Sequence, residues 1–538
     1  MPLSLRSQYA YIPASIRAGF SMGPLQPPVS TILHPNHYKA DRQLSIDSWA
    51  SKSKAAGFIA GPWPVDEVVA TVGPVHAAPI SIVDKFDQGV LVKERIVYDA
   101  SYPQPRPGRP SPSIPSINSQ IRKDDYPCEW MTAVETKHLF RTVPPYARFA
   151  GFDLKDAFQQ VGNSPSQRTL FCVHVLGMIY VWLVGIFGLR SICGIFGALC
   201  DVTCWYIEYC FPDLLLRHYV DDFLLVDLAP PSSAHANRSF SLLLDAVRAF
   251  GWEIHPEKHF SWTRSFTFLG FDWDFNSRSV TLSPRKHLKF QHKLSSLLEP
   301  QTSPGSSSPS LRPPQVLEKD VASVIGSCQH VCVVAPHRRS KLNGLYAFRN
   351  SFRGTHPGAR QYLTTAALRE VKDWYNFFDA GPISCSLDSS TTFFPLEVYT
   401  DASDYALGVV LGDKALYIPL PPDYTSRPGI NIGVGEAWAF ELGIAAAVAA
   451  GASGHILVCH VDNQGVVFSV RRGRSRNNLV NEAIDRAAEF ALSHNVELSI
   501  RYVRSADNFA DAPSRADTSG YSPLVFPFFP HWHSVLAS

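Results

Sequence analysis

Alternation of hydrophobic and polar residues predicts short β-strands in the first half of the chain. The expected strands are 80–83, 90–98, 147–152 and the two halves of 214–226. Segment 147–152 ends directly before Asp153, and the turn within 214–226 carries Asp221 and Asp222. The pattern therefore predicts a sheet with aspartates at its strand ends.

Helical periodicity dominates the centre of the chain, and strands return near its end. Helices are expected at 239–251, 284–298, 316–352, 435–450 and 477–494, and strands at 396–401, 409–411, 455–461 and 496–503. The Pro- and Ser-rich run 299–314 is too polar to pack, so a linker inserted in a helical region is expected. The last strands and helices predict a compact α/β unit.

Two other segments have an unusual composition: residues 1–80 have weak periodicity, and residues 169–189 are strongly apolar. Residues 1–80 are Pro- and Ser-rich with weak periodicity, which predicts an irregular extension. Residues 169–189 are long enough to span a membrane. Their three glycines and many β-branched or aromatic residues favour two buried strands joined by a turn at Leu176 and Gly177. A protein anchored by 169–189 stays an alternative that rests on hydropathy alone.

Composition narrows the class of protein. A chain of 538 residues with 45% hydrophobic residues can form three or four domains of roughly 150 residues. The formal net charge is +2, so any basic track for nucleic acid has to be local. The ten cysteines include no C-x-x-C pair, which argues against a disulfide framework, and the N-terminus lacks a signal-like apolar run. An intracellular, cytoplasmic or nuclear protein that is not secreted is expected.

The aspartate pair at the predicted turn is the first candidate for chemistry. Adjacent carboxylates at a buried turn repel each other unless a cation neutralises them. Asp153 at the end of a neighbouring strand would complete a site for two divalent cations, which phosphodiester synthesis requires about 3.5–4 Å apart. A plain surface turn is the alternative. The apolar strands on both sides of Asp221 and Asp222 favour a hairpin with one face in a core.

Five ordered motifs resemble those of retroelement reverse transcriptases, most of all the gypsy-like and DIRS-like groups. Phe152-Asp-Leu-Lys-Asp-Ala-Phe158 resembles motif A, and Tyr219-Val-Asp-Asp222 resembles motif C. The segments that resemble motifs B, D and E are 188–196, 251–258 and 268–271. Ile186 and Cys193 stand where the family usually has prolines. That departure keeps open a catalytically inactive or domesticated nucleic-acid-binding relative.

The resemblance implies a role for each matching residue. Asp153, Asp221 and Asp222 would bind the metal ions, whereas Asp156 would not. The residues implied at the dNTP are Arg95 on the triphosphate, Phe158 as the gate against a 2′-hydroxyl, Gly188 in the motif B loop, and Lys258 at the departing pyrophosphate. A lysine on a surface turn is the equal alternative for Lys258.

A second set of acids lies in the last α/β unit. Asp401, Glu436, Asp462 and Asp511 fall at predicted strand ends, at a predicted helix start and after the last strand. Their surroundings resemble the RNase H domain of the same retroelements, which implies a second site for two metals. Glu436 as a helix-opening acid also fits a plain interaction with the helix dipole.

Two clusters of arginines are candidate contacts for nucleic acid. Arg338 and Arg339 lie in the region that resembles a thumb, and Arg471, Arg472 and Arg474 follow the third acid of the second set. Contact with nucleic acid and a solvated helix face are the two interpretations, and the first is favoured.

The resemblance implies an α+β multidomain fold, a right-hand polymerase followed by an RNase H-like α/β domain. The implied divisions are an extension at 1–80, fingers and palm at 81–285, thumb and connection at 286–392, an RNase H-like domain at 393–517 and a tail at 518–538. Two Mg²⁺ or Mn²⁺ ions per site, an RNA or DNA template, a primer, dNTPs and RNA/DNA hybrid are the implied ligands. No membrane is involved, and an integrase or recombinase would be a separate protein.

Overall fold

The computed structural model divides the chain into two compact units. The first comprises Met1–Thr136 and Val143–Arg264, and the second comprises Lys137–Thr142 and Ser265–Ser538. The structure describes residues 9–23, 25–87, 90–105, 112–235, 238–299, 315–356, 358–388 and 392–525. Residues 300–314 of the expected linker at 299–314 and residues 526–538 of the expected tail at 518–538 lie outside the described residues, and both stay predictions.

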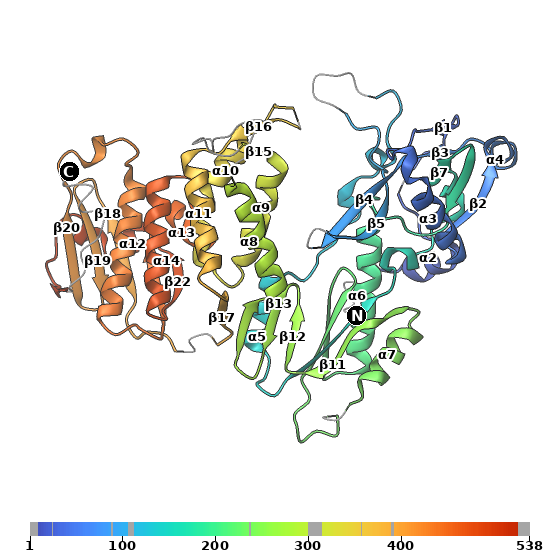
Figure 1. Ribbon diagram of the computed structural model, residues 1–538. Helices are drawn as coiled ribbons and strands as arrows, with labels where there is room; N and C mark the ends of the chain where they lie inside the picture. Colours follow the sequence, from blue (N-terminus) through green and yellow to red (C-terminus); the bar gives the residue numbers. More distant parts are fainter. Residues whose placement is uncertain are drawn as a thin grey trace. The chain divides into compact units, whose positions relative to one another are not determined.

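The first unit contains a four-stranded antiparallel sheet that holds the aspartates. Figure 1 labels its edge strand, β11 (Ile254–Thr263). The order of the sheet is β11-β6-β10-β9, with β6 at Arg148–Leu154, β9 at Leu214–Tyr219 and β10 at Asp222–Asp227. Helices α6 (Ile192–Cys210) and α7 (Phe240–Ala249) pack against it and share its apolar core. The strand, turn and strand expected over 214–226 are confirmed.

The N-terminal segment is not irregular, and that prediction was wrong. It forms α2 (Ile12–Ala18), α3 (Gln43–Ala55) and α4 (Val65–Val72), together with β1 (Ile32–Leu33), β2 (Ile59–Pro64) and β3 (His76–Ala77). These strands join β7 (Cys172–Val175) and β8 (Met178–Trp182) in a sheet of order β1-β3-β7-β8-β2. The partner strands come about a hundred residues later in the chain, and two of the N-terminal strands have two residues each, so local periodicity carries little signal.

The apolar stretch 169–189 forms strands rather than a membrane helix. β7 and β8 are joined by a turn at Leu176 (φ 48°) and Gly177 (φ 78°), as expected. The alternative of a membrane anchor at 169–189 is therefore contradicted. Among the described residues, α6 and α12 (Ile432–Ala449) have the length and composition of a membrane span, with 56% and 78% of the relevant window buried inside the protein.

Strands β4 (Ile80–Asp87) and β5 (Val90–Tyr98) form a two-stranded antiparallel hairpin. They confirm the strands expected at 80–83 and 90–98.

Helices and a small sheet form the start of the second unit. β12 (Ser265–Phe268), β13 (Phe271–Asp274), β14 (Ser279–Leu282) and β17 (Ser384–Ser386) make the sheet. Helices α8 (Pro284–Leu298), α9 (Glu318–Val331), α10 (Asn343–Asn350) and α11 (Thr365–Asp379) follow one another along the chain. The helical segment expected at 316–352 is confirmed, but it is not continuous: the short helix η6 (Pro336–Ser340) separates α9 from α10, and Pro336 lacks the N–H that a continuing helix needs.

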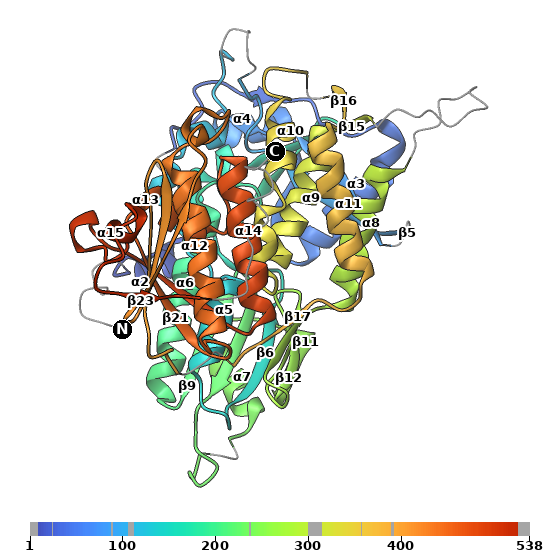
Figure 2. The same cartoon turned by 90° about the vertical axis from the view of Figure 1, so that its left-hand side faces the viewer.

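A six-stranded mixed sheet forms the last part of the second unit. Its order is β22-β21-β18-β19-β20-β23, with β18 (Val398–Ala402), β19 (Ala406–Leu411), β20 (Lys414–Pro419), β21 (Ile456–Val461), β22 (Glu497–Tyr502) and β23 (Ser522–Pro523). β18 pairs antiparallel with β19 and parallel with β21. Helix α12 packs on this sheet and on α14 (Asn478–Ser493), as Figure 2 shows. The expected α/β unit is confirmed.

Candidate functional site

The hairpin β9–β10 places the aspartates of the first site. Asp222 pairs with Asp153 across β10 and β6, and with Tyr219 across the hairpin. Val220 and Asp221 therefore form a two-residue turn. Val220 has a φ of 56°, a left-handed conformation that costs a β-branched residue about 1–3 kcal/mol and persists only where the surroundings impose it. Such local strain is typical of a functional turn.

The carboxyl groups at this turn have raised pKa values. Burial raises the pKa of Asp222 to about 6, with further contributions from the charges of Asp221 and Asp153. Burial also raises the pKa of Asp221. Lys258, in the middle of β11, donates to Oδ2 of Asp153 at 2.8 Å, and this hydrogen bond raises the pKa of Lys258. Three carboxylates held against one ammonium group leave a surplus negative charge that suits a divalent cation.

The proposed nucleotide-binding residues lie on three different elements of the first unit. Phe158 is buried in the short helix Ala157–Gln160, directly after β6, with its ring 5.1 Å from the ring of Phe196. Gly188 has a φ of 106° and its carbonyl accepts from Asn118 Nδ2 at 2.8 Å, a conformation that glycine adopts without strain. Arg95 is exposed on β5, and no described contact links it to the aspartates.

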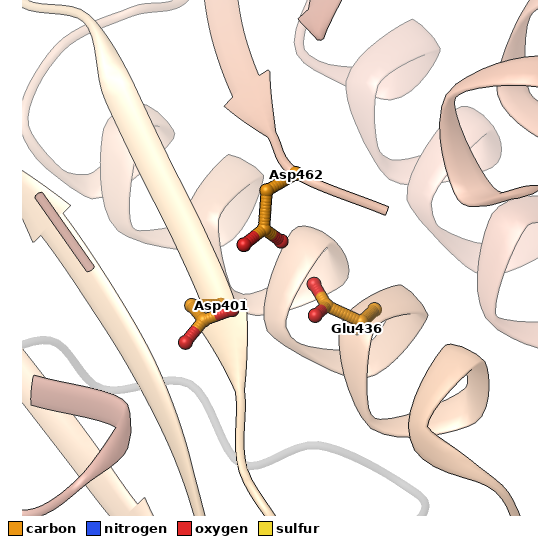
Figure 3. A group of neighbouring side chains, drawn as sticks. All are labelled: Asp401, Glu436 and Asp462. Carbon is orange, nitrogen blue, oxygen red and sulfur yellow. The ribbon is translucent and has the colours of Figure 1, made fainter. Parts of the chain in front are cut away.

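The second site gathers three acids from two neighbouring parallel strands and one helix. Asp401 lies in β18, Asp462 follows β21, and Glu436 projects from α12. Each offers an oxygen, and these oxygens lie within 4.8 Å of one another. Figure 3 shows the three carboxylates pointing toward a common centre. Because β18 and β21 run parallel, both deliver their acids at the same edge of the sheet.

The environment of these acids favours a bound cation. Burial, then the charges of Asp401 and Asp462, raise the pKa of Glu436 to about 10. Oε2 of Glu436 is buried without a hydrogen-bond partner among the described residues. Burial is also the main cause that raises the pKa of Asp401 to about 6. An all-oxygen set with an orphaned buried oxygen fits a hard cation such as Mg²⁺ or Mn²⁺.

Two features of this site differ from expectation. Glu436 does not open its helix, because α12 begins a turn earlier at Ile432, so the helix-dipole interpretation is wrong. Asp511 is not one of the three converging acids. It begins the short helix Asp511–Ser514 and pairs with Arg515 at 3.1 Å.

Ser514 is a site residue that sequence reasoning missed. Its hydroxyl is fully buried and donates to Oδ2 of Asp401 at 2.5 Å. The spacing of three residues after Asp511 was visible in the sequence, but a single serine carries no charge or periodicity that marks it. The contact fixes the orientation of the Asp401 carboxylate.

The basic residues divide into buried and exposed groups. Arg338 is 7% exposed, lies over the rings of Trp374 and Phe377, and pairs with Asp373. The predicted contact of Arg338 with nucleic acid is therefore contradicted, because its guanidinium is engaged in packing. The aromatic rings that bury it lie more than thirty residues away in the sequence.

The other four arginines are more accessible. Arg474 lies 4.3 Å from the centre of the Tyr346 ring, and Arg339 donates to the carbonyl of Arg472. Arg471 and Arg472 are exposed at the end of α13 (Gln464–Arg472). A contact with nucleic acid stays a prediction for these four residues.

A Glu436→Gln substitution tests the electrostatics of the second site. Since the folded-state pKa of Glu436 is raised from 4.5 to about 10, the folded metal-free protein holds a proton that the unfolded chain releases. Its contribution to stability is present below pH 4.5 and is lost as the pH rises towards about 10. We expect the variant to unfold at a higher temperature than the wild type at about pH 8 without metal, and to respond less to added Mg²⁺. Equal melting curves of the two proteins with and without Mg²⁺ would contradict this account.

No protein-family model matches the chain, and no curated protein matches it. Among solved structures, the chain is similar to a foamy viral protease-reverse transcriptase in complex with RNA/DNA hybrid, at 12% identity and a TM-score of 0.48. That match covers 98% of this chain and 63% of the viral chain, so this chain spans less than two thirds of its length. A structure of the viral protein with dsDNA is similar at 14% identity and a TM-score of 0.43, covering 94% of each chain. At these TM-scores, the function has to be inferred from the chain's own residues.

Proposed function

We propose that the chain is an RNA-directed DNA polymerase that also cleaves the RNA strand of RNA/DNA hybrids. The observation that carries the proposal is the register of β6, β9 and β10, which sets Asp222 opposite Asp153 at a strained turn. The second carboxylate group, at the ends of β18 and β21, supports the nuclease activity. The combination fits copying of RNA into DNA better than DNA synthesis alone.

Residues of the first unit would have separate roles in DNA synthesis. Asp153, Asp221 and Asp222 would hold two Mg²⁺ or Mn²⁺ ions. Such ions activate a hydroxyl nucleophile and stabilise the leaving oxygen. The turn conformation of Val220 orients Asp221 and Asp222, and Lys258 balances the charge of Asp153. Lys258 would donate a proton to pyrophosphate once its ion pair with Asp153 opens.

Residues of the second unit would have separate roles in cleavage of the RNA strand. Asp401, Glu436 and Asp462 would hold the ions that attack on the RNA strand requires, and Ser514 orients Asp401. Asp511 adds negative charge near Asp401, since it contributes to raising the pKa of that carboxyl. Arg471 and Arg472 would contact the phosphates of the hybrid.

We further propose that the protein serves a retroelement of the gypsy-like or DIRS-like kind. An RNA or DNA template, a primer and dNTPs are its substrates, and integration of the DNA product falls to another protein. The proposed site of action is intracellular. Primer extension on an RNA template with Mg²⁺ tests the polymerase, and cleavage of a labelled RNA/DNA hybrid tests the nuclease.

Phe158 is proposed to exclude ribonucleotides. Its buried ring is held between Phe196 and Phe187, so it cannot swing away from a 2′-hydroxyl without breaking that packing. Phe158→Ala is expected to raise incorporation of rNTP relative to dNTP by roughly 10- to 200-fold, the range for removing one steric contact in a pocket. Phe158→Tyr keeps the ring and is expected to keep the selectivity. Unchanged selectivity in Phe158→Ala, measured as the ratio of kcat/KM values, would contradict the role.

A further inference from the structure

Two histidines of the first unit lie side by side, away from both groups of acids. His76 begins β3, and His34 follows β1 directly. Figure 1 labels the two strands, β1 and β3. They are parallel, with Ile32 opposite His76. Residues two apart on a strand share a face, so His34 lies on the same face of the sheet as His76. Their ring centres are 5.4 Å apart, with the planes at 54°.

Both imidazoles have a buried nitrogen with no hydrogen-bond partner. Nε2 of His34 and Nε2 of His76 are shielded from solvent, and neither meets a donor or acceptor among the described residues. His76 as a whole is 2% exposed. A buried polar atom without a partner is uncommon in folded proteins and points to a bound water or ion. Two of them on adjacent rings point to one shared occupant.

The protonation state suits coordination of a metal. Burial, and then the neighbouring His34, lower the pKa of His76 to about 4. Burial also lowers the pKa of His34. Both rings are therefore neutral at physiological pH, and a neutral imidazole is a common metal ligand because one ring nitrogen keeps its lone pair. Two imidazoles on one Zn²⁺, with Zn–N distances of about 2.0 Å, place their ring centres roughly 5–6 Å apart.

We propose that His34 and His76 bind one Zn²⁺ ion between β1 and β3. Imidazole nitrogen favours Zn²⁺, Ni²⁺ and Cu²⁺, whereas the carboxylate groups of the chain favour Mg²⁺ and Mn²⁺. The histidine pair is thus a metal site of a different class from the two groups of acids. The nearby His37 has an exposed side chain and no buried nitrogen without a partner, so it is not assigned to the site; the rings of His34 and His37 both contact Tyr102, at 5.0 and 4.9 Å between ring centres.

The ion would fasten a weakly paired part of the sheet. β1 and β3 have two residues each, and β3 meets β7 at the single pair Ala77 and Cys172. Few backbone hydrogen bonds hold these strands, so a crosslink between them adds proportionally more to their stability than it would in a longer strand. The expected consequence is a stiffer N-terminal sheet in the presence of Zn²⁺, with no dependence on polymerase or nuclease activity.

Calorimetric titration of the full chain with Zn²⁺ in excess Mg²⁺ tests the proposal. The wild type and His37→Ala are expected to bind one more equivalent of Zn²⁺ than His34→Gln and His76→Gln, and Zn²⁺ is expected to raise the Tm of the first pair by about 2–4 °C more. All four proteins keep the two groups of acids, so any Zn²⁺ bound there is the same in each and cancels when the numbers of bound equivalents are subtracted.

Three results would overturn the site. Equal stoichiometry in the wild type and His34→Gln would mean that a buried water links the two rings. Loss of the equivalent in His37→Ala would show that the ligand set is not this pair. Should His76→Gln fail to fold, the comparison of wild type, His34→Gln and His37→Ala decides the question alone, because His34 and His37 lie nearer the surface.

Discussion

Asp221→Asn and Asp222→Asn are each expected to lower the rate of dNTP incorporation by at least about 10³-fold, with little change in the affinity for primer and template. An asparagine fills the same space in the turn but cannot supply the negative charge that balances a divalent cation, and loss of one such group in a preorganised site costs about 10²–10³-fold or more. The measurement is single-turnover primer extension with Mg²⁺.

The matched control for this experiment is Asp156→Asn. Asp156 lies in the same motif, three residues after Asp153, but adopts a left-handed conformation (φ 55°) at the start of the next short helix. It is expected to leave the rate within a few fold of the wild type, since asparagine tolerates this conformation. Full incorporation by Asp221→Asn or Asp222→Asn would remove these aspartates from the polymerase mechanism.

The double variant Asp401→Asn, Asp462→Asn is expected to lose cleavage of the RNA strand and to keep DNA synthesis. The remaining acid of the three, Glu436, cannot hold two divalent ions alone, and burial, the largest cause of its raised pKa, persists in the double variant. A loss of at least about 10³-fold in the cleavage rate of an end-labelled hybrid is the expected effect.

Asp423→Asn serves as the control for the nuclease, because Asp423 lies in the same unit on an exposed loop, where it pairs with Arg427. Its cleavage rate should equal that of the wild type. Cleavage that persists in the double variant would place the nuclease elsewhere or assign it to a contaminating enzyme. Simultaneous loss of DNA synthesis would instead mean that the substitutions disturb the whole chain.

Local patterns predicted those elements whose signal lies within a few residues. The alternation over 90–98 and the periodicity over 284–298 coincide with β5 and α8. The apolar run before Asp153 and the turn at Asp221 also lie where they were expected, because strand ends and turns depend on nearby residues.

Features that depend on distant partners escaped prediction. The N-terminal strands β1 and β3 are stabilised by β7, which lies about a hundred residues later, so their own sequence does not mark them. The sequence predicted that Arg338 is a surface cation, but the rings of Trp374 and Phe377, which lie on α11, bury it. Tertiary packing overrides local composition in both cases.

The sequence predicted which acids belong to the second site, but not how their carboxylates are arranged in space. The resemblance to RNase H domains gave four acids, and the structure brings three of them within 4.8 Å. Asp511 is engaged by Arg515, a pairing at a spacing of four residues that the sequence contains. The orienting contact from Ser514 to Asp401 spans 113 residues and had no local signal.

Primer extension by the wild-type chain on an RNA template tests the central proposal most directly. With Mg²⁺ or Mn²⁺ and all four dNTPs, the account predicts a DNA product of template length whose sequence complements the RNA, and shortening of the RNA strand as the product grows. Tight binding of the primed template with no extension under either metal would contradict it. That result would identify the chain as an inactive nucleic-acid-binding relative, consistent with Ile186 and Cys193 in place of the usual prolines.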